Sequence, residues 1–292
     1  MSKISLGQME VGVKSINLLM FPSDPSYYPA ASRLQRQAID SGWFKDIYIY
    51  GLDKRLERFI PSCVGDGFAD EIPRGFGLWS WKPEFIVYCM DNLIKSDEYI
   101  VYLDVGCEIN SQGVSFLDFF LEKAQQDLIV TTSTKKLNLL WSSRNLIRRY
   151  KPSLKTLFSY QYQAGLIVFR NSDIVLSFMT DWMSDCLIND YEFLRDKSIW
   201  EGWLGENRHD QSVFSLLANE RNIAYPLRYS LSYNYKVMVT SEFMAAFPFW
   251  PCRNLSSQSI QEEHPIGVST SFFARLKFFV LRIIAKFCDS AL

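Results

Sequence analysis

Short apolar runs alternate with longer segments of mixed polarity along most of the chain. The short runs have the length and composition of buried strands, and they cover 16–21, 46–50, 99–103, 128–132, 165–170 and 223–225. Between them, helical patterns cover 30–41, 83–94, 116–125, 172–187 and 210–220. Strands that alternate with helices predict an α/β fold, in which a mostly parallel central sheet is covered by helices on both faces.

Three segments do not follow this alternation. Residues 51–59 predict a turn and a short helix, and 137–150 form a basic amphipathic segment. Residues 65–78 are rich in glycine and acids and predict a loop. No internal repeat interrupts the pattern, so we expect one large domain with at most a small appendage.

Composition narrows the functional classes. The formal net charge is −1, from 31 basic and 32 acidic residues, so nothing indicates a nucleic-acid partner. Six scattered cysteines and two histidines argue against a Cys/His zinc site and favour a reducing compartment. Neither a secretory signal nor an uncharged run of about 18 residues, the length needed to span a bilayer, is evident. The 45 aromatic residues (22 Phe, 15 Tyr, 8 Trp) fit either a large core or a surface that stacks on sugar rings.

An abrupt change from apolar to acidic residues follows the strand predicted at 99–103. Asp104, Gly106 and Glu108 would share one face if the extended conformation continues, because side chains in a strand alternate between faces. Two carboxylates around a residue without a side chain could seat a divalent cation that holds a diphosphate. The alternative is a strand that ends in a turn with an Asp cap.

Two cations, two glycines and two tryptophans gather at 74–83, just before a predicted helix. Helix N-termini attract phosphate through free amides and the helix dipole, and Lys82 would add a point charge there, with Arg74 nearby. A glycine turn with core tryptophans is equally compatible with these residues alone. Because the helix leads into the strand before Asp104, we favour a functional role.

Small residues open the strand predicted at 165–170. Ala164 and Gly165 follow Gln163, and the lack of side-chain bulk suits the close approach of a ligand or of another backbone. Tight packing at Gly165 remains the structural alternative.

A dense polar cluster precedes the helix predicted at 210–220. Asp210 is a good N-cap, but a cap alone does not explain Glu206, Arg208, His209 and Gln211 around it. An active site that orients a hydroxyl beside an anionic leaving group would use these residue types. We therefore predict a functional cluster here.

The C-terminal segment has a different character. Residues 271–287 predict an apolar helix on which Arg275, Arg282 and Lys286 share one narrow face. Such a helix suits an anionic membrane surface, and docking on the domain is the alternative. We expect a domain at 1–267 and a basic amphipathic helix at 268–292. His264, just before this helix, is a candidate metal ligand or an ordinary surface residue.

The order of these segments resembles a family of sugar transferases. The segments are 24–28, 74–77 with 81–83, 102–108, 163–165 and 208–212. Together, over about residues 15 to 255, they look like a bacterial GT-A type glycosyltransferase of lipopolysaccharide O-antigen and capsule assembly. More distantly they are similar to glycogenin-like sugar transferases. In that group the acid motif is Asp-x-Asp, whereas Gly106 takes the third position here, so Glu108 or His264 would complete a metal shell.

The resemblance implies a GT-A, Rossmann-like fold and transfer from a nucleotide diphosphate sugar, expected to be a UDP-sugar, to a lipid-linked glycan. The enzyme would be peripheral at the inner, cytoplasmic face of the membrane and would serve surface polysaccharide assembly. Asp104 with Mn²⁺ or Mg²⁺ would hold the diphosphate, Lys82 would neutralise the leaving group and Asp24 would contact the nucleoside. The donor and its cofactor would be bound by Asp24, Arg74, Lys82, Asp104, Gly106, Gln163, Ala164, Gly165, Arg208 and His209.

Catalysis is assigned by the same resemblance to Asp210, with Gln211 and Glu206 beside it. Asp210 would act as a base on the acceptor hydroxyl if the reaction inverts, or would contact a sugar hydroxyl if it retains. Two other classes stay open. A glycoside hydrolase would need two carboxylates that flank the bond and no diphosphate pocket. A non-catalytic scaffold at the membrane face would tolerate the loss of Asp104 and Lys82.

Overall fold

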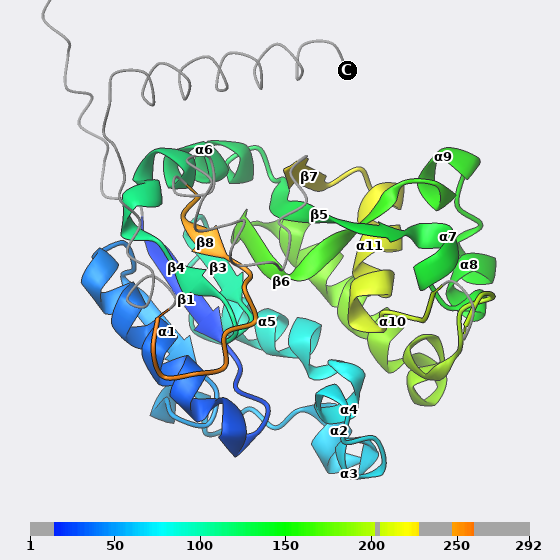
Figure 1. Cartoon of the computed structure of the whole chain (residues 1–292), viewed down its shortest axis with the longest axis horizontal. Helices are drawn as coiled ribbons and strands as arrows, with labels where there is room; N and C mark the ends of the chain where they lie inside the picture. The colour runs from blue at the N-terminus through cyan, green and yellow to red at the C-terminus, as the bar shows by residue number, and fades with distance from the viewer. Residues whose placement is uncertain (1–14, 202–204, 228–246, 260–292) are drawn as a thin grey trace, which may run out of the picture.

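The computed structural model describes residues 15–201, 205–227 and 247–259 (Figure 1). Its centre is a six-stranded sheet in the order β2-β1-β3-β6-β5-β7, in which only β6 runs against its neighbours. The strands are β1 (Ile16–Met20), β2 (Asp46–Ile49), β3 (Tyr99–Leu103), β5 (Ile129–Leu137), β6 (Tyr160–Arg170) and β7 (Ala224–Leu227). The predicted α/β class with a mostly parallel sheet is confirmed.

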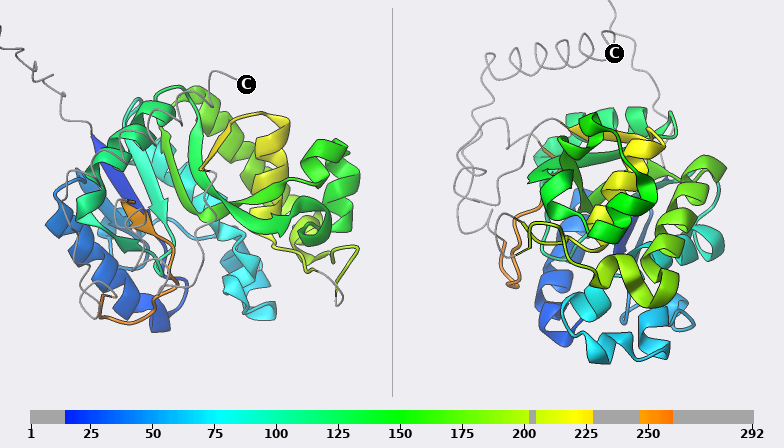
Figure 2. Two further views of the ribbon diagram at one scale, coloured as in Figure 1. Left: turned by 45° about the horizontal axis from the view of Figure 1, so that its top comes forward. Right: turned by 90° about the vertical axis from the view of Figure 1, so that its right-hand side faces the viewer.

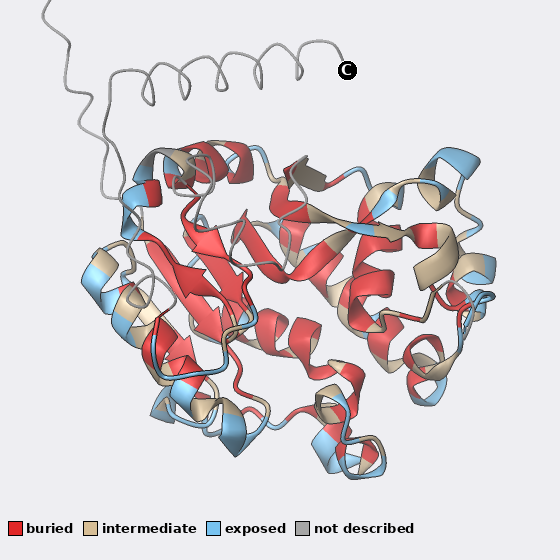
Figure 3. Cartoon of the chain, in the orientation of Figure 1, coloured by how far each residue is buried: buried red, intermediate tan, exposed pale blue. Residues whose placement is uncertain are grey.

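Helices cover both faces of this sheet because its strands are apolar on both sides. Leu18 and Met20 of β1 belong to a core with α1 and α6, whereas Leu19 and the following Phe21 belong to a second core with α5, α10 and α11. The main helices are α1 (Tyr28–Ser41), α5 (Trp81–Asn92), α6 (Val114–Ala124), α10 (Asp173–Arg195) and α11 (Asp210–Glu220). Figure 3 shows that burial is concentrated in the strands and in the helix sides that face them.

Short helices lie at two places outside this layered centre. The helices α7 (Asn138–Trp141), α8 (Arg144–Tyr150) and α9 (Leu154–Leu157) lie at the end of the molecule opposite α1, as Figure 1 and the left view of Figure 2 both show. The helices α7 and α8 divide the predicted basic segment 137–150. The other group is α2 (Ser62–Gly65), α3 (Phe68–Glu71) and α4 (Gly75–Leu78).

The prediction of a loop at 65–78 is therefore wrong. Each of these helices is a single turn, too short to show a periodic sequence pattern. Tertiary contacts hold them instead: Tyr191 of α10 stacks on Phe68 with ring centroids 3.8 Å apart and bonds to Asp66. Arg195 adds two bonds to the Glu71 carboxylate, at 2.6 and 2.7 Å.

The strands β5 and β6 and the helix α10 are longer than their sequence patterns predicted. The polar end of β5 is held as a strand by pairing with β6, where Ser133 lies opposite Tyr162 and Leu137 opposite Tyr160. The helix α10 continues to Arg195 across a kink at residues 188–191, where the backbone leaves helical geometry. Long-range pairing and packing decide these extensions, and neither is visible in a local pattern.

The chain turns immediately after β3. The amide of Cys107 donates to the carbonyl of Asp104 at 2.8 Å, and the short strand β4 (Glu108–Ile109) then pairs with β8 (Phe249–Trp250) in a separate sheet. The expectation that Asp104, Gly106 and Glu108 share one face of an extended strand is therefore wrong. The turn sends the two carboxylates to different surroundings.

The predicted C-terminal helix at 268–292 and His264 lie outside the described residues. Within the ranges that the structure describes, no helix is both long and apolar enough to cross a bilayer.

Candidate active site

Three of the sequence segments meet at the side chain of Lys82, at the edge of the sheet where β3 ends. Lys82 lies in the first turn of α5, Asp104 follows β3, and Asp210 begins α11. The Lys82 Nζ is 3.0 Å from Oδ2 of Asp210 and 3.3 Å from Oδ1 of Asp104. One ammonium therefore bridges two carboxylates from distant parts of the chain.

The three side chains differ sharply in exposure. The side chains of Lys82 and Asp210 are 4% and 5% exposed, whereas that of Asp104 is 45% exposed. Asp104 is thus the member of this group that a ligand can reach. The sequence predicted that Lys82 adds a point charge at a helix N-terminus, and the structure places its ammonium beneath the half-exposed Asp104 carboxylate.

Burial and charge act in opposite directions on this group. Burial alone lowers the pKa of Lys82, but the charges of Asp104 and Asp210 raise it by a larger amount, so the net shift of this pKa is upward. Burial raises the pKa of Asp210, and the charge of Lys82 opposes that rise. Lys82 is therefore protonated at neutral pH, as a buried cation with two acidic partners should be.

A glycine makes room for the Asp104 carboxylate. Leu103 pairs with Leu166, which brings Gly165 of β6 beside Asp104, and the Asp104 amide donates to the Gly165 carbonyl at 2.8 Å. A Cβ on Gly165 would stand 2.2 Å from Oδ2 of Asp104. The Tyr102 hydroxyl donates to Oδ1 at 2.9 Å. Ala164 and Gly165 predicted the close approach of a ligand or of another backbone. In the structure it is the Asp104 side chain that approaches Gly165 closely.

A buried glutamine network fixes the start of α11. The Gln161 amide donates to the Trp141 carbonyl at 3.0 Å and to the Ser212 hydroxyl at 3.1 Å, and its oxygen accepts from Gln211 at 2.8 Å. Gln161 is not among the site residues that the sequence predicted, although it lies two positions before Gln163 on the same strand. The Gln163 side chain instead accepts from the Thr132 hydroxyl at 2.6 Å.

Basic side chains gather around Glu206. Its carboxylate is 3.2 Å from Arg74 and 3.5 Å from Arg208. Lys136, near the end of β5, places its Nζ 3.2 Å from the centre of the Trp141 ring. Partial burial, together with the charges of Arg208 and Arg253, lowers the pKa of Lys136 to about 8, against the opposing charge of Glu206. Cations therefore outnumber anions here.

His209 occupies an unusual backbone position between Arg208 and Asp210. Its φ of 53° is in the left-handed region, where a residue with a side chain is strained, so the turn into α11 is held by its surroundings. The ring Nδ1 is 2.9 Å from the Leu194 carbonyl, and the Trp79 ring lies 5.9 Å away at a small angle. Burial lowers the pKa of His209 to about 4.

We expect the His209 imidazole to remain neutral from pH 5.5 to 8, because burial disfavours its charged form. Its ring ¹H–¹⁵N correlations should therefore stay fixed across that range in an NMR titration. The chain has only two histidines, so a His209→Asn spectrum assigns the signal. A midpoint near the ordinary value of about 6.5 would contradict this burial.

Asp24 lies at the same edge of the sheet, just after β1. Its Oδ1 accepts from the Ser26 amide at 2.8 Å and caps the short 3-10 helix η1 (Pro25–Tyr27). The side chain is exposed, which leaves its predicted contact with a nucleoside a prediction.

Two of the residues predicted to hold Mn²⁺ or Mg²⁺, Asp104 and Glu108, are described by the structure, and their carboxylates lie in different surroundings. The Glu108 carboxylate is fully buried and accepts from Asn254 at 2.7 Å, from Ser259 at 2.7 Å and from Gln37 at 3.4 Å. The Asp104 carboxylate is engaged by Lys82 and Tyr102. Among the described residues, no three or more His, Cys, Asp or Glu side chains gather as a metal site would require. The metal stays a prediction from the sequence.

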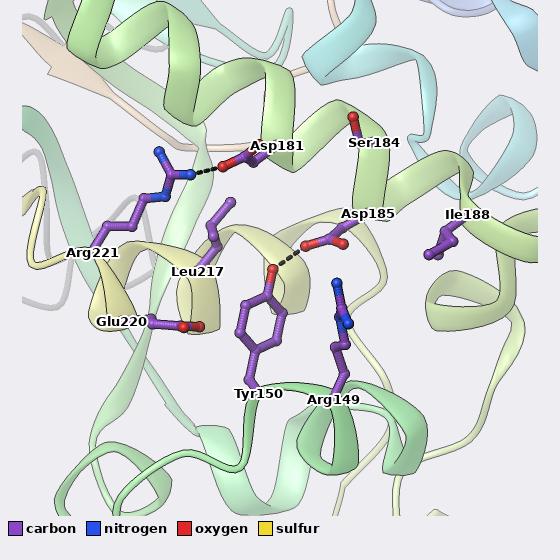
Figure 4. A pocket seen from close by; sticks show the side chains of 9 residues that line it. All are labelled: Arg149, Tyr150, Asp181, Ser184, Asp185, Ile188, Leu217, Glu220 and Arg221. Atoms are coloured by element: carbon purple, nitrogen blue, oxygen red, sulfur yellow. Dashed lines mark hydrogen bonds and ion pairs between the residues drawn. The ribbon is translucent and has the colours of Figure 1, made fainter.

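A pocket of about 510 Å³ lies at the other end of α11, between α8 and α10 (Figure 4). Tyr150 bonds to Asp185 across it, and Arg221 pairs with Asp181. None of the predicted site residues lines it. We assign it no part in the chemistry around Lys82.

Comparison with known proteins gives only distant matches. No protein-family model and no curated protein matches the chain. Among solved structures it is similar to a glycosyltransferase involved in the glycosylation of the major capsid of PBCV-1, at 12% identity and a TM-score of 0.36, over 62% of this chain and 71% of that one. It is also similar to mouse xyloside xylosyltransferase 1, at 10% identity and a TM-score of 0.37, over 73% of this chain and 84% of that one.

The bifunctional glycosyltransferase WbbM matches at 11% identity and a TM-score of 0.41, over 74% of this chain and 39% of that chain. This chain therefore spans less than half of WbbM. All three structures are glycosyltransferases. Because every TM-score lies below 0.5, these matches establish neither a shared fold nor a shared activity.

Proposed function

We propose that this protein is a nucleotide-sugar-dependent glycosyltransferase. The observation that carries the proposal is the half-exposed Asp104 carboxylate at the end of a central parallel strand, backed by the buried Lys82–Asp210 pair. Ligands of open α/β sheets bind at this edge. The basic residues around Glu206 add positive charge beside it, which suits a diphosphate leaving group.

The half-exposed Asp104 and the buried Asp210 have different roles in this proposal. Asp104 accepts hydrogen bonds from hydroxyl groups of the donor, and Tyr102 and Gly165 hold its carboxylate in place. Asp210 is buried against Lys82, so we assign it to hold that lysine and not to take a proton from the acceptor. In the reaction, the bond from the sugar C1 to the β-phosphate oxygen breaks and its electron pair leaves with the nucleoside diphosphate. A bond from C1 to the acceptor oxygen forms, and the proton of the acceptor hydroxyl passes to water.

The finer assignments rest on the sequence resemblance. We propose a UDP-sugar as donor, a lipid-linked glycan as acceptor and a role in bacterial surface polysaccharide assembly. The predicted helix at 268–292 would hold the enzyme to an anionic membrane on the cytoplasmic side.

The test is a screen of nucleotide sugars and nucleoside diphosphates. Specific ligands raise the melting temperature by mass action, and turnover releases a nucleoside diphosphate that a coupled assay measures. We expect stabilisation by one nucleotide class and slow release of its diphosphate even without an acceptor. A chain that binds no nucleotide sugar and no nucleoside diphosphate contradicts the proposal.

Asp104→Asn should slow this release about tenfold or more, because hydrogen bonds to a charged acceptor are stronger than those to an amide. Since the side chain is half exposed, the free energy of unfolding should change by less than about 1 kcal/mol. Asp40→Asn is the matched control, because Asp40 is an exposed carboxylate on α1. Equal rates for the Asp104→Asn and Asp40→Asn variants would remove Asp104 from the site.

The arrangement of the Asp104 and Asp210 carboxylates does not fit a glycoside hydrolase. Such an enzyme keeps two carboxylates about 5 Å or more apart, with the scissile bond between them. Here the space between Asp104 and Asp210 is taken by the Lys82 ammonium. A non-catalytic scaffold would show no diphosphate release in the same screen.

A further inference from the structure

We propose that the side-chain cations of Lys136, Arg208 and Arg253 neutralise the diphosphate of the donor. In this site they take the place of a divalent metal ion. The inference rests on the proposed function and names how its leaving group is held. It departs from the Mn²⁺ or Mg²⁺ that the sequence predicted.

The first observation is the state of the candidate metal ligands. Asp104 already faces a cation, because Lys82 lies 3.3 Å from its Oδ1 and the Tyr102 hydroxyl donates to the same oxygen. Glu108 is buried and saturated by Asn254 and Ser259. A divalent ion needs several oxygen ligands that converge on one point, and these two carboxylates do not converge.

The second observation concerns the position where an Asp-x-Asp motif would carry its second acid. That position is Gly106, and a Cβ there would stand 3.1 Å from the Cα of Arg253. The Asn254 amide donates to the Gly106 carbonyl at 2.9 Å, which fixes the two backbones together. The backbone of an exposed arginine therefore lies beside the position at which an Asp-x-Asp motif would carry its second carboxylate.

The third observation is the arrangement of the other cations. Arg208 has Glu206 as its ion-pair partner at 3.5 Å, and that carboxylate is shared with Arg74. Lys136 lies over the Trp141 ring, and besides burial the charges of Arg208 and Arg253 lower its pKa, whereas Glu206 raises it. Arg208 lies at the same tryptophan, because its amide donates to the Trp141 carbonyl at 3.1 Å. Cations that repel one another in this way favour an anion among them. A diphosphate supplies that anion beside Asp104.

The proposal makes a specific claim about pH. Lys136 has a pKa of about 8, so it is charged below that pH and neutral above it. A bound diphosphate stabilises the charged form, so affinity is highest below pH 8 and falls as pH rises to 9.5. Lys136→Arg keeps its charge over this range and should remove the fall.

Calorimetry with UDP, GDP and ADP at pH 7, in EDTA and in excess Mn²⁺, tests the inference. We expect one of these nucleotides to bind in EDTA with an affinity within about threefold of that in Mn²⁺. Lys136→Ala and Arg253→Ala should each weaken it about tenfold or more, as the loss of a charge-assisted contact does. Lys155→Ala and Arg58→Ala are charge-matched controls at exposed positions elsewhere.

The outcomes separate the two proposals. Binding that appears only with Mn²⁺ overturns the cation site and leaves the glycosyltransferase standing. Binding in EDTA that Lys136→Ala and Arg253→Ala leave unchanged also overturns it, because the diphosphate then lies elsewhere. No binding of any nucleoside diphosphate in either condition contradicts the proposed function itself, and the inference falls with it.

Discussion

Replacing Lys82 with methionine should abolish measurable turnover and destabilise the fold. Methionine keeps the length of the side chain but leaves Asp104 and Asp210 without the ammonium that bridges them. Removing one partner of a buried ion pair typically destabilises a protein by about 3 to 5 kcal/mol, because the remaining charge is uncompensated. We expect a loss in turnover of about a thousandfold, since the exposed Asp104 carboxylate would no longer be held by a cation.

The instability should depend on pH in a defined direction. Burial already raises the pKa of Asp210, and the loss of Lys82 removes the main interaction that opposes that rise. The folded variant then binds a proton that the unfolded chain releases, so its stability increases as the pH falls. Urea unfolding at pH 5 and pH 8 should show a smaller deficit at pH 5.

A double variant provides the control for Lys82→Met. Lys82→Met with Asp210→Asn removes both buried charges, so it should regain much of the stability at pH 8 without regaining turnover. A single variant as stable as the unchanged chain at pH 8 would show that Lys82 and Asp210 do not form the buried pair.

The layered fold could be predicted because its strands and helices are each consistent with their local patterns. Buried strands such as β1 and β3 read as apolar runs, and α11 begins and ends at the predicted residues. Polar residues that end or precede these elements indicated Lys82, Asp104 and Asp210 as candidate site residues. Their convergence follows from topology, because α5 and α11 lead into the parallel strands β3 and β7 and therefore begin at the edge of the sheet where β3 ends.

The partners of these residues could not be predicted. Lys82 was expected to offer its charge to a phosphate at a helix N-terminus, because the sequence does not show that a carboxylate from the distant α11 lies beside it. Glu108 was expected beside Asp104 because the period of a strand was extended through a turn. The turn is held from outside the local sequence: Arg33 of α1, a buried cation, donates to the carbonyls of Val105 at 3.1 Å and Cys107 at 2.8 Å.

The role of Gly165 shows how a correct signal can have a different cause. Missing side-chain bulk at 164–165 indicated the close approach of a ligand or a backbone. The structure fills that space with the Asp104 carboxylate, so the glycine shapes the site through a neighbour.

Gly165→Ala should therefore reduce turnover by about a hundredfold. The new methyl group would lie 2.2 Å from Oδ2 of Asp104, and the carboxylate must move to restore an ordinary contact. A displacement of about 1 Å in a site of this kind can slow the reaction about a hundredfold. Because Asp104 is half exposed and can move outward, we expect a loss of about 1 to 3 kcal/mol in the free energy of unfolding, which leaves the variant folded.

Gly65→Ala is the matched control, because a Cβ at Gly65 meets nothing within 4 Å. Gly65 closes the short helix α2, so alanine there should leave turnover unchanged and the stability equal or slightly higher. Rates of nucleoside diphosphate release for the two variants, each shown to be folded by circular dichroism, decide the question. A Gly165→Ala variant that turns over at the rate of Gly65→Ala would mean that the Asp104 carboxylate does not need its present position, and Asp104 would lose its place in the proposed site.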